Sequence, residues 1–265
     1  MGGGSYSIGV DLGSTAIKMV LVKSWEIEWS RKVPTAPGQE ALALELVRGA
    51  MDERGLSEGD IGGIAATGYG KKLMSRAGVT VDEISANAKG LFRLSGGRCR
   101  TIINIGGQDL KVITLDQAGK VADFKMNDKC AAGTGRFFEQ AARILDTPLE
   151  SFGKAAGSDA EPAELNSTCV VFAESEMVSL LAKGVPKERI IKGLHNSVAR
   201  RVANLLGRHR PAGDGDIYLD GGPSQNRGLL EALEDELLTE VKVLPNPQYT
   251  VAYGAAISAA GRKDA

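Results

Sequence analysis

The spacing of apolar residues alternates between two kinds of segment along the chain, which predicts an α/β protein. Short apolar runs that end near glycine, such as residues 8–12 and 103–105, are typical of strands followed by tight turns. Other segments place apolar residues three or four positions apart, as in Ile190, Leu194 and Val198, and predict helices with one buried face. Helices are predicted at residues 39–54, 134–145, 170–183, 187–208, 229–240 and 251–260.

A strand–turn–strand pattern occurs twice in the sequence. Residues 8–22 contain an apolar strand, a turn and a second strand, and residues 103–113 repeat that order after a shift of 93 positions. Under this shift three pairs of residues correspond: Asp11 and Asn104, Gly13 and Gly106, Lys18 and Lys111. A later pair of segments, 64–70 and 217–223, is related by a shift of 153 positions, which predicts an insertion in the second copy.

This duplication predicts two similar domains, each with a mixed sheet and helices, and a ligand cleft between them. We place the first domain at residues 1–97 and the second at residues 98–247. The last helix, within residues 248–265, is expected to return and pack on the first domain.

Composition narrows the classes of partner and compartment. The 265 residues are 43% hydrophobic, which is enough for an ordinary globular core. Lys and Arg number 32 and Asp and Glu 33, so no strong field favours nucleic acid or a membrane as partner. With no basic leader and no apolar run of membrane-spanning length, a cytoplasmic location is expected. Three cysteines are too few for a disulfide scaffold and are either buried thiols or metal ligands.

The two glycine turns are predicted to bind a polyphosphate. Glycine lets backbone N–H groups approach phosphate oxygens, although a single turn of this kind is as often a plain hairpin. Asp11 is a candidate magnesium ligand through water, Gln108 could orient the attacking water, and residues 221–226 suit the adenosine. The predicted nucleotide contacts are Gly13, Ser14, Thr15, Lys18, Gly106, Gly107, Asp109, Gly133, Gly135, Gly221, Gly222 and Asn226.

Cys130 and Cys169 each precede a predicted helix, and a helix N-terminus favours a thiolate. A [4Fe–4S] cluster usually takes four thiolates, so two such cysteines per chain would complete the set only across the two-fold axis of a homodimer. Two unrelated core cysteines are an equally good reading of the spacing alone, because 39 residues between them match no compact metal motif.

Three short motifs carry the predicted nucleotide contacts: Asp11-Leu-Gly-Ser-Thr, Asn104-Ile-Gly-Gly-Gln-Asp and Asp220-Gly-Gly-Pro. They resemble the two phosphate motifs and the adenosine motif of the superfamily of actin, Hsp70 chaperones and sugar kinases. The resemblance implies two duplicated ribonuclease-H-like domains that bind ATP and Mg²⁺ in the cleft between them. It leaves open a small-molecule kinase, a chaperone-type switch, or an ATPase coupled to another event.

Two further motifs surround the cysteines, at residues 127–137 and 167–176. They closely resemble the activator component of (R)-2-hydroxyacyl-CoA dehydratases, whose wider family includes the ATPase subunits of benzoyl-CoA reductase. The resemblance implies that Cys130 and Cys169 hold one [4Fe–4S] cluster per homodimer. It also implies ATP-coupled electron transfer from a ferredoxin or flavodoxin to an iron–sulfur dehydratase or reductase component. A kinase would need inserted elements around an acceptor, and a chaperone would need a peptide-binding domain.

The sequence departs from this family pattern at several positions. Asn104 stands where such activators usually have Asp, which shifts magnesium binding toward Asp11. Ala86 and Asn87 replace a common Cys-His pair, and Pro223 and Ser224 replace the usual small apolar pair after the two glycines. Cys99 matches no ligand position and is expected to be a structural thiol.

The two histidines, His195 and His209, lie on the predicted helix 187–208 or just after it. Neither has a second histidine at metal-ligand spacing. Both are therefore expected to be surface or interface residues rather than catalytic groups.

Overall fold

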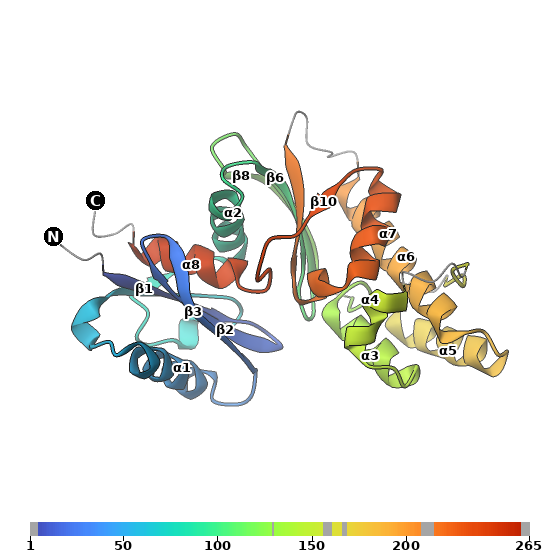
Figure 1. Cartoon of the computed structure of the whole chain (residues 1–265), viewed down its shortest axis with the longest axis horizontal. Helices are drawn as coiled ribbons and strands as arrows, with labels where there is room; N and C mark the ends of the chain where they lie inside the picture. The colour runs from blue at the N-terminus through green and yellow to red at the C-terminus, as the bar shows by residue number, and fades with distance from the viewer. Residues whose placement is uncertain (1–4, 129, 156–160, 166–168, 208–214, 261–265) are drawn as a thin grey trace. The chain divides into compact units, whose positions relative to one another are not determined.

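The computed structural model describes residues 5–128, 130–155, 161–165, 169–207 and 215–260, and they form two compact α/β units (Figure 1). Unit 1 consists of Met1–Arg98, Leu115–Val121 and Gln248–Ala265, and unit 2 of Cys99–Thr114 and Ala122–Pro247. Each unit has its own sheet and its own apolar core.

Unit 1 is built on a mixed sheet with the strand order β3-β2-β1-β4-β5. Its strands are β1 (Tyr6–Leu12), β2 (Ala16–Lys23), β3 (Glu26–Pro34), β4 (Ile61–Thr67) and β5 (Val79–Thr80). β1 pairs antiparallel with β2 and parallel with β4. The carboxyl ends of β1 and β4 therefore lie next to each other at the same edge of the sheet.

Helices cover both faces of this sheet. α1 (Gln39–Arg54) packs its apolar stripe on β1 and β2, whereas α8 (Thr250–Ala260) lies on β1 and β4 and also packs against α2 (Glu83–Leu94). The approach of α8 requires glycine in β1, because a Cβ at Gly9 would collide with the carbonyl oxygen of Ala252. The last helix is thus part of the core of unit 1.

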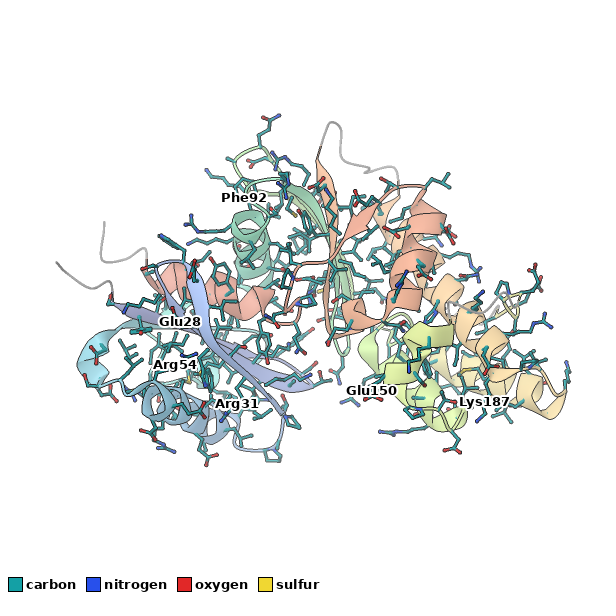
Figure 2. All side chains as sticks on the ribbon, viewed as in Figure 1. Glu28, Arg31, Arg54, Phe92, Glu150 and Lys187 are labelled. Atoms are coloured by element: carbon teal, nitrogen blue, oxygen red, sulfur yellow. The ribbon has the colours of Figure 1, made fainter. Side chains whose placement is uncertain are left out.

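Polar side chains fasten α1 to the neighbouring strand β3. Glu53 of the helix forms an ion pair of 2.8 Å with Arg31, and it also accepts a hydrogen bond from the ring of Trp29 at 2.7 Å. The guanidinium of Arg54 donates to the carbonyl oxygen of Glu28 (Figure 2). The contacts of Arg31 and Arg54 lie at the exposed rim of the unit and each contributes little to stability, whereas the Trp29 hydrogen bond is partly buried.

Unit 2 repeats the sheet of unit 1, in the order β10-β9-β6-β7-β8. Its strands are β6 (Cys99–Ile105), β7 (Leu110–Leu115), β8 (Val121–Asn127), β9 (Asp216–Gly221) and β10 (Val241–Lys242). β6 pairs antiparallel with β7 and parallel with β9, just as β1 does with β2 and β4. The duplication predicted from the two sequence shifts is confirmed.

The helices of unit 2 bury their apolar faces against β6, β7 and β9 in one core. They are α3 (Gly135–Ile144), α4 (Phe152–Ala155), α5 (Val170–Ala182), α6 (Lys187–Leu206) and α7 (Arg227–Leu237). Short 3-10 turns lie at Glu58–Asp60, Lys71–Leu73, Leu149–Ser151 and Gly222–Gln225. Among the described residues, no helix combines the length and the apolar character that crossing a membrane requires.

The expectation that His195 is a surface or interface residue is wrong. Its side chain is 1% exposed and lies between the aromatic rings of Phe138 and Phe152, with centroid distances of 6.0 and 6.5 Å. The reason is its position next to Leu194, on the stripe that α6 turns toward the core of unit 2. His209 lies outside the described residues.

Candidate functional site

Hydrogen bonds within the turn and from Thr35 fix the shape of the turn between β1 and β2. Gly13 donates its N–H to the carbonyl of Ala16 at 3.2 Å, and its own carbonyl accepts from the hydroxyl of Thr35 at 2.8 Å. The N–H of Thr35 also donates to the carbonyl of Thr15 at 3.0 Å. Ser14 and Thr15 remain partly exposed, so this part of the turn is accessible to a ligand.

Three polar side chains, one each from the neighbouring strands β2, β1 and β4, form a row on one face of the sheet near this turn. Lys18 and Asp11 are paired across the hairpin, with 2.8 Å between Nζ and Oδ2, and Thr67 is the partner of Asp11 in β4. Because Val10 and Leu12 pack on the α1 side, Asp11 and its neighbours lie on the opposite face of the sheet. We call Lys18, Asp11 and Thr67 the first polar row.

Unit 2 contains the equivalent row, formed by Lys111, Asn104 and Asp220 on β7, β6 and β9. We call it the second polar row. Asn104 Nδ2 donates to Asp220 Oδ1 at 2.7 Å, and Lys111 Nζ pairs with Asp109 Oδ1 at 2.7 Å. All four side chains are buried, so the amide and the ammonium group compensate two carboxylates that water cannot reach.

Thr67 and Asp220 are candidate site residues that were not among the predicted nucleotide contacts, although Asp220 begins the third of the sequence motifs. The signal was present, since the shift of 153 positions that relates the two later strands places Thr67 on Asp220. What was missing was the register, which brings these strand ends beside Asp11 and Asn104.

The turn between β6 and β7 serves as the support on which α3 begins. Gly106 donates its N–H to the carbonyl of Asp109 at 2.9 Å, as Gly13 does in its own turn. The carbonyls of Gly106 and Gly107 accept the N–H groups of Gly135 at 2.8 Å and Arg136 at 3.0 Å. The first amides of α3 are therefore bound to the turn. This differs from the expectation that they are free to stabilise a thiolate.

Gly135, Gly133 and Gln108 define the rest of the region around this contact. A Cβ at Gly135 would lie 3.2 Å from the carbonyl oxygen of Gly106, so the close approach of helix and turn depends on glycine. Gly133 adopts φ of 91°, in the left-handed region. Gln108 is exposed, and with its amide oxygen facing Arg136 it accepts from Nε at 3.2 Å and from Nη2 at 3.3 Å.

The segment after β9 also requires glycine. Gly221 has φ of 92°, and a Cβ there would collide with the carbonyl oxygen of Ile105, whereas Gly222 faces open space. Asn226 is the N-cap of α7, and its Oδ1 accepts two backbone N–H groups at 3.1 and 3.3 Å. Its Nδ2 lies 2.9 Å from Nε2 of His195. Both ends of the Asn226 side chain therefore have partners within unit 2.

His195 is neutral in the folded protein. Because the Asn226 amide oxygen is occupied by backbone donors, its Nδ2 donates to Nε2 of His195, and the imidazole proton sits on Nδ1. Burial lowers the pKa of His195 to about 4. This histidine is therefore no proton carrier near neutral pH.

The free energy of unfolding should fall as the pH is lowered from about 6.5 to about 4. In this range unfolded His195 takes up a proton while the folded form does not, so the unfolded state gains. The full effect is on the order of 3 kcal/mol. Denaturant unfolding at a series of pH values measures it. His195→Gln, which keeps an acceptor for Asn226 but cannot titrate, should flatten the profile; an unchanged profile in that variant would contradict the assignment.

Cys130 and Cys169 precede two neighbouring helices of unit 2. Cys169 is the N-cap of α5, whereas Cys130 stands five residues before α3, and both residues are partly exposed. The helices touch where Gln140 donates to Glu174 at 3.3 Å, within about two turns of each helix start. Lys129 and residues 166–168, which belong to the cysteine motifs, lie outside the described residues.

The side chains that could bind a metal ion were compared within the part of one chain that the structure describes. Among the residues that the structure describes, no group of three or more His, Cys, Asp or Glu side chains is placed to hold a metal ion. Cys99 is fully buried, its thiol faces the carbonyl of Thr101 at 3.7 Å, and burial raises its pKa, so it stays protonated. The two partly exposed thiols, Cys130 and Cys169, are therefore the cysteines of the chain with the chemistry of a metal ligand.

Two cavities lie within unit 1. One of about 600 Å³ adjoins the first turn and is lined by Thr35 and the residues that follow it, as far as Glu40. A larger one of about 1160 Å³ lies among Trp25, Arg93 and Tyr253 and includes none of the predicted site residues. The chemistry of the turns and polar rows, rather than cavity size, therefore identifies the candidate site.

Comparisons with known proteins identify the family and several relatives of this chain. The model of the BadF/BadG/BcrA/BcrD ATPase family matches residues 8–259. The activator of lactoyl-CoA dehydratase from Anaerotignum propionicum is 43% identical over 255 residues, which are 96% of this chain and 97% of that protein.

Solved structures give the same picture. The activator of the 2-hydroxyisocaproyl-CoA dehydratase from Clostridium difficile, with bound ADPNP, has a TM-score of 0.90 and 37% identity, covering 98% of this chain and 96% of the other. A ROK family glucokinase from Streptomyces griseus reaches a TM-score of 0.61 at 17% identity, covering 96% and 99%, and thus shares the fold alone. The predicted sugar-kinase-like fold class is confirmed.

Proposed function

Because the chain belongs to the BadF/BadG/BcrA/BcrD ATPase family, we propose that it is an ATP-hydrolysing activator of a 2-hydroxyacyl-CoA dehydratase. In this proposal two copies of the chain share one [4Fe–4S] cluster. The activator receives an electron from a ferredoxin or flavodoxin in the cytoplasm and passes it to an iron–sulfur component of the dehydratase. The names of the relatives support the activator role, and the cysteine geometry supports the cluster.

Each unit contributes a turn to nucleotide binding in this proposal. Gly13 and Gly106 use their N–H groups to shape their own turns, so the phosphate contacts fall mainly to the next residues, Ser14, Thr15 and Gly107. Gly221 and Gly222 leave the backbone open for the adenosine, while Asn226 supports that segment as the cap of α7. Gln108, exposed beside Arg136, orients the attacking water.

Asp11 holds the magnesium ion through water, and Lys18 binds a phosphate oxygen. These two side chains form an ion pair of 2.8 Å with each other, so nucleotide binding has to separate them. In the second polar row the cation remains with Asp109, and Asn104 carries no charge. Asp11 is therefore the carboxylate of the two central positions that suits magnesium.

Cys130 and Cys169 of each copy hold the cluster. When bound, the cluster supplies a site that accepts and releases one electron. Cys169 stands at the N-terminus of α5, where the helix dipole favours the negative charge of a thiolate. The positive end of α5 therefore also favours a reduced state.

The proposed function rests mainly on the contact between α3 and the turn that joins β6 and β7, which we call the second turn. The carbonyls of Gly106 and Gly107 accept the first two amides of α3, and the segment that leads into α3 contains Cys130. A phosphate that shifts this turn would therefore shift the helix start and the cysteine segment before it.

Binding of ADPNP should change the rate at which a chelator removes iron from the anaerobically purified protein, relative to ADP. Coupling between two sites is typically 1–3 kcal/mol, which corresponds to a factor of about 5 to 150. By reciprocity, oxidising the cluster should change nucleotide affinity by a similar factor. Identical chelation rates together with identical affinities would contradict the coupled function.

Gly135→Ala tests the route of this coupling. The added methyl group would press on the carbonyl of Gly106, so the coupling factor should fall toward one while iron content is retained. Gly49→Ala in α1 is the matched control, because its Cβ would meet no atom closer than 3.9 Å. Loss of coupling in both variants, or in neither, would contradict the proposed route.

A further inference from the structure

Thr67 carries a hydroxyl group that the fold itself does not use. Its side chain is completely buried at the end of β4, and Oγ1 has no hydrogen-bond partner among the described residues. A buried hydroxyl without a partner destabilises a protein, and valine would fill the same space without that cost. The hydroxyl is therefore available to a partner that it acquires in another state.

The group best placed to become that partner is the carboxylate of Asp11. The two residues are register neighbours in β1 and β4 and share one face of the sheet. Oδ2 of Asp11 is bound to Lys18, whereas Oδ1 points toward β4, since a Cβ on Gly68 would lie 2.5 Å from it. A rotation of the carboxylate that turns Oδ1 further toward β4 would turn it toward the hydroxyl of Thr67.

Unit 2 demonstrates that this kind of contact fits the sheet. At the corresponding positions, Asn104 and Asp220 are joined by a hydrogen bond of 2.7 Å between the central strand and its parallel neighbour. In unit 1 the same contact would run from the Thr67 hydroxyl to the Asp11 carboxylate.

We propose that Thr67, at the end of β4, is a positioning residue for Asp11. Its hydroxyl donates to the Asp11 carboxylate when Lys18 leaves that carboxylate for a phosphate group. The inference rests on the proposed ATPase function. Once Lys18 has moved, Asp11 is a buried carboxylate that has lost its cation, which is unfavourable without a replacement donor. Thr67 supplies that donor and keeps Asp11 oriented for a magnesium-bound water.

A stability cycle on the full-length, nucleotide-free protein tests the alternation between the two partners. Thr67→Val alone should leave the melting temperature unchanged or raise it, because the hydroxyl has no partner while Lys18 holds Asp11. In a Lys18→Met background, the same substitution should lower it by roughly 2–4 °C, because Asp11 then depends on Thr67. An effect of the same sign in both backgrounds would overturn the proposal.

The turnover of ATP provides a second measurement. Thr67→Val should lower kcat by about tenfold, the worth of one hydrogen bond to a charged group, whereas Thr67→Ser should stay within about twofold of the unsubstituted chain. A variant that is at least as stable and yet slower cannot be explained by damage to the fold. Undiminished turnover in Thr67→Val would overturn the proposal. If the unsubstituted protein hydrolyses no ATP, the proposed function fails, and the stability cycle still decides the role of Thr67.

Discussion

Replacing Cys130 or Cys169 by alanine is expected to abolish the iron–sulfur chromophore. The two thiols are partly exposed and lie near the starts of neighbouring helices. Among the described residues, no further ligand of the same chain could replace a cysteine that is lost. A cluster with two ligands missing, one from each copy, would not be retained. Visible absorption and iron content after anaerobic purification measure this.

Cys99→Ala is the matched control. Cys99 is fully buried and burial raises its pKa, so its removal should leave both absorption and iron content intact. The parent protein should contain about four irons per two chains. Four irons per single chain would contradict a shared cluster, and bleaching in Cys99→Ala would contradict the ligand assignment.

The sequence was most informative where the backbone repeats itself. The shift of 93 positions matched Asn104 to Asp11 and Lys111 to Lys18, and the strand registers then place Lys111 opposite Asn104 as Lys18 is opposite Asp11. Glycine turns and alternating apolar residues are local signals, so they survive without knowledge of the tertiary structure. The duplicated fold could therefore be predicted.

Helix α2 was missed because its buried face is made mainly of small or polar residues, with Leu91 as the large apolar side chain among those buried. That face contains Ala86, Asn87 and Gly90, and a Cβ at Gly90 would collide with the carbonyl of Thr250 in α8. Small residues are selected by the close crossing of two helices, which apolar periodicity does not register. The end of α7 was placed too late for another reason, since Leu238 adopts φ of 53° and closes the helix.

The site could be predicted as a set of residue types but not as a set of contacts. The bond from Gly135 to Gly106 joins residues 29 positions apart, and the bond from Asn226 to His195 joins residues 31 apart. Neither leaves a periodic trace in the sequence. These contacts decide which N–H groups remain for a ligand, and they show α3 bound to the second turn rather than directed at a thiolate.

Asp11→Asn is expected to lower the rate of magnesium-dependent ATP hydrolysis by about 100-fold or more. The substitution gives the first polar row the same central amide as the second row, where Asn104 stands at that position. With both central positions uncharged, the carboxylates that remain near the polar rows are Asp220 and Asp109, which are buried and bound to Asn104 and Lys111. Neither replaces Asp11 as a magnesium partner, and electrostatic groups of this kind typically contribute such factors to kcat. Rates measured across a range of magnesium concentrations test the expectation.

Glu53→Gln is the matched control for the loss of one negative charge in unit 1. Glu53 also forms an ion pair of 2.8 Å, with Arg31, but it lies at the exposed rim between α1 and β3. Its substitution should leave the rate and the magnesium dependence unchanged, because an exposed pair contributes little and touches neither turn. Asp11→Asn should in addition require more magnesium for half-maximal rate. Equal turnover in the two variants would remove Asp11 from the catalytic role and, with it, the reason for Lys18 and Thr67 to alternate around its carboxylate.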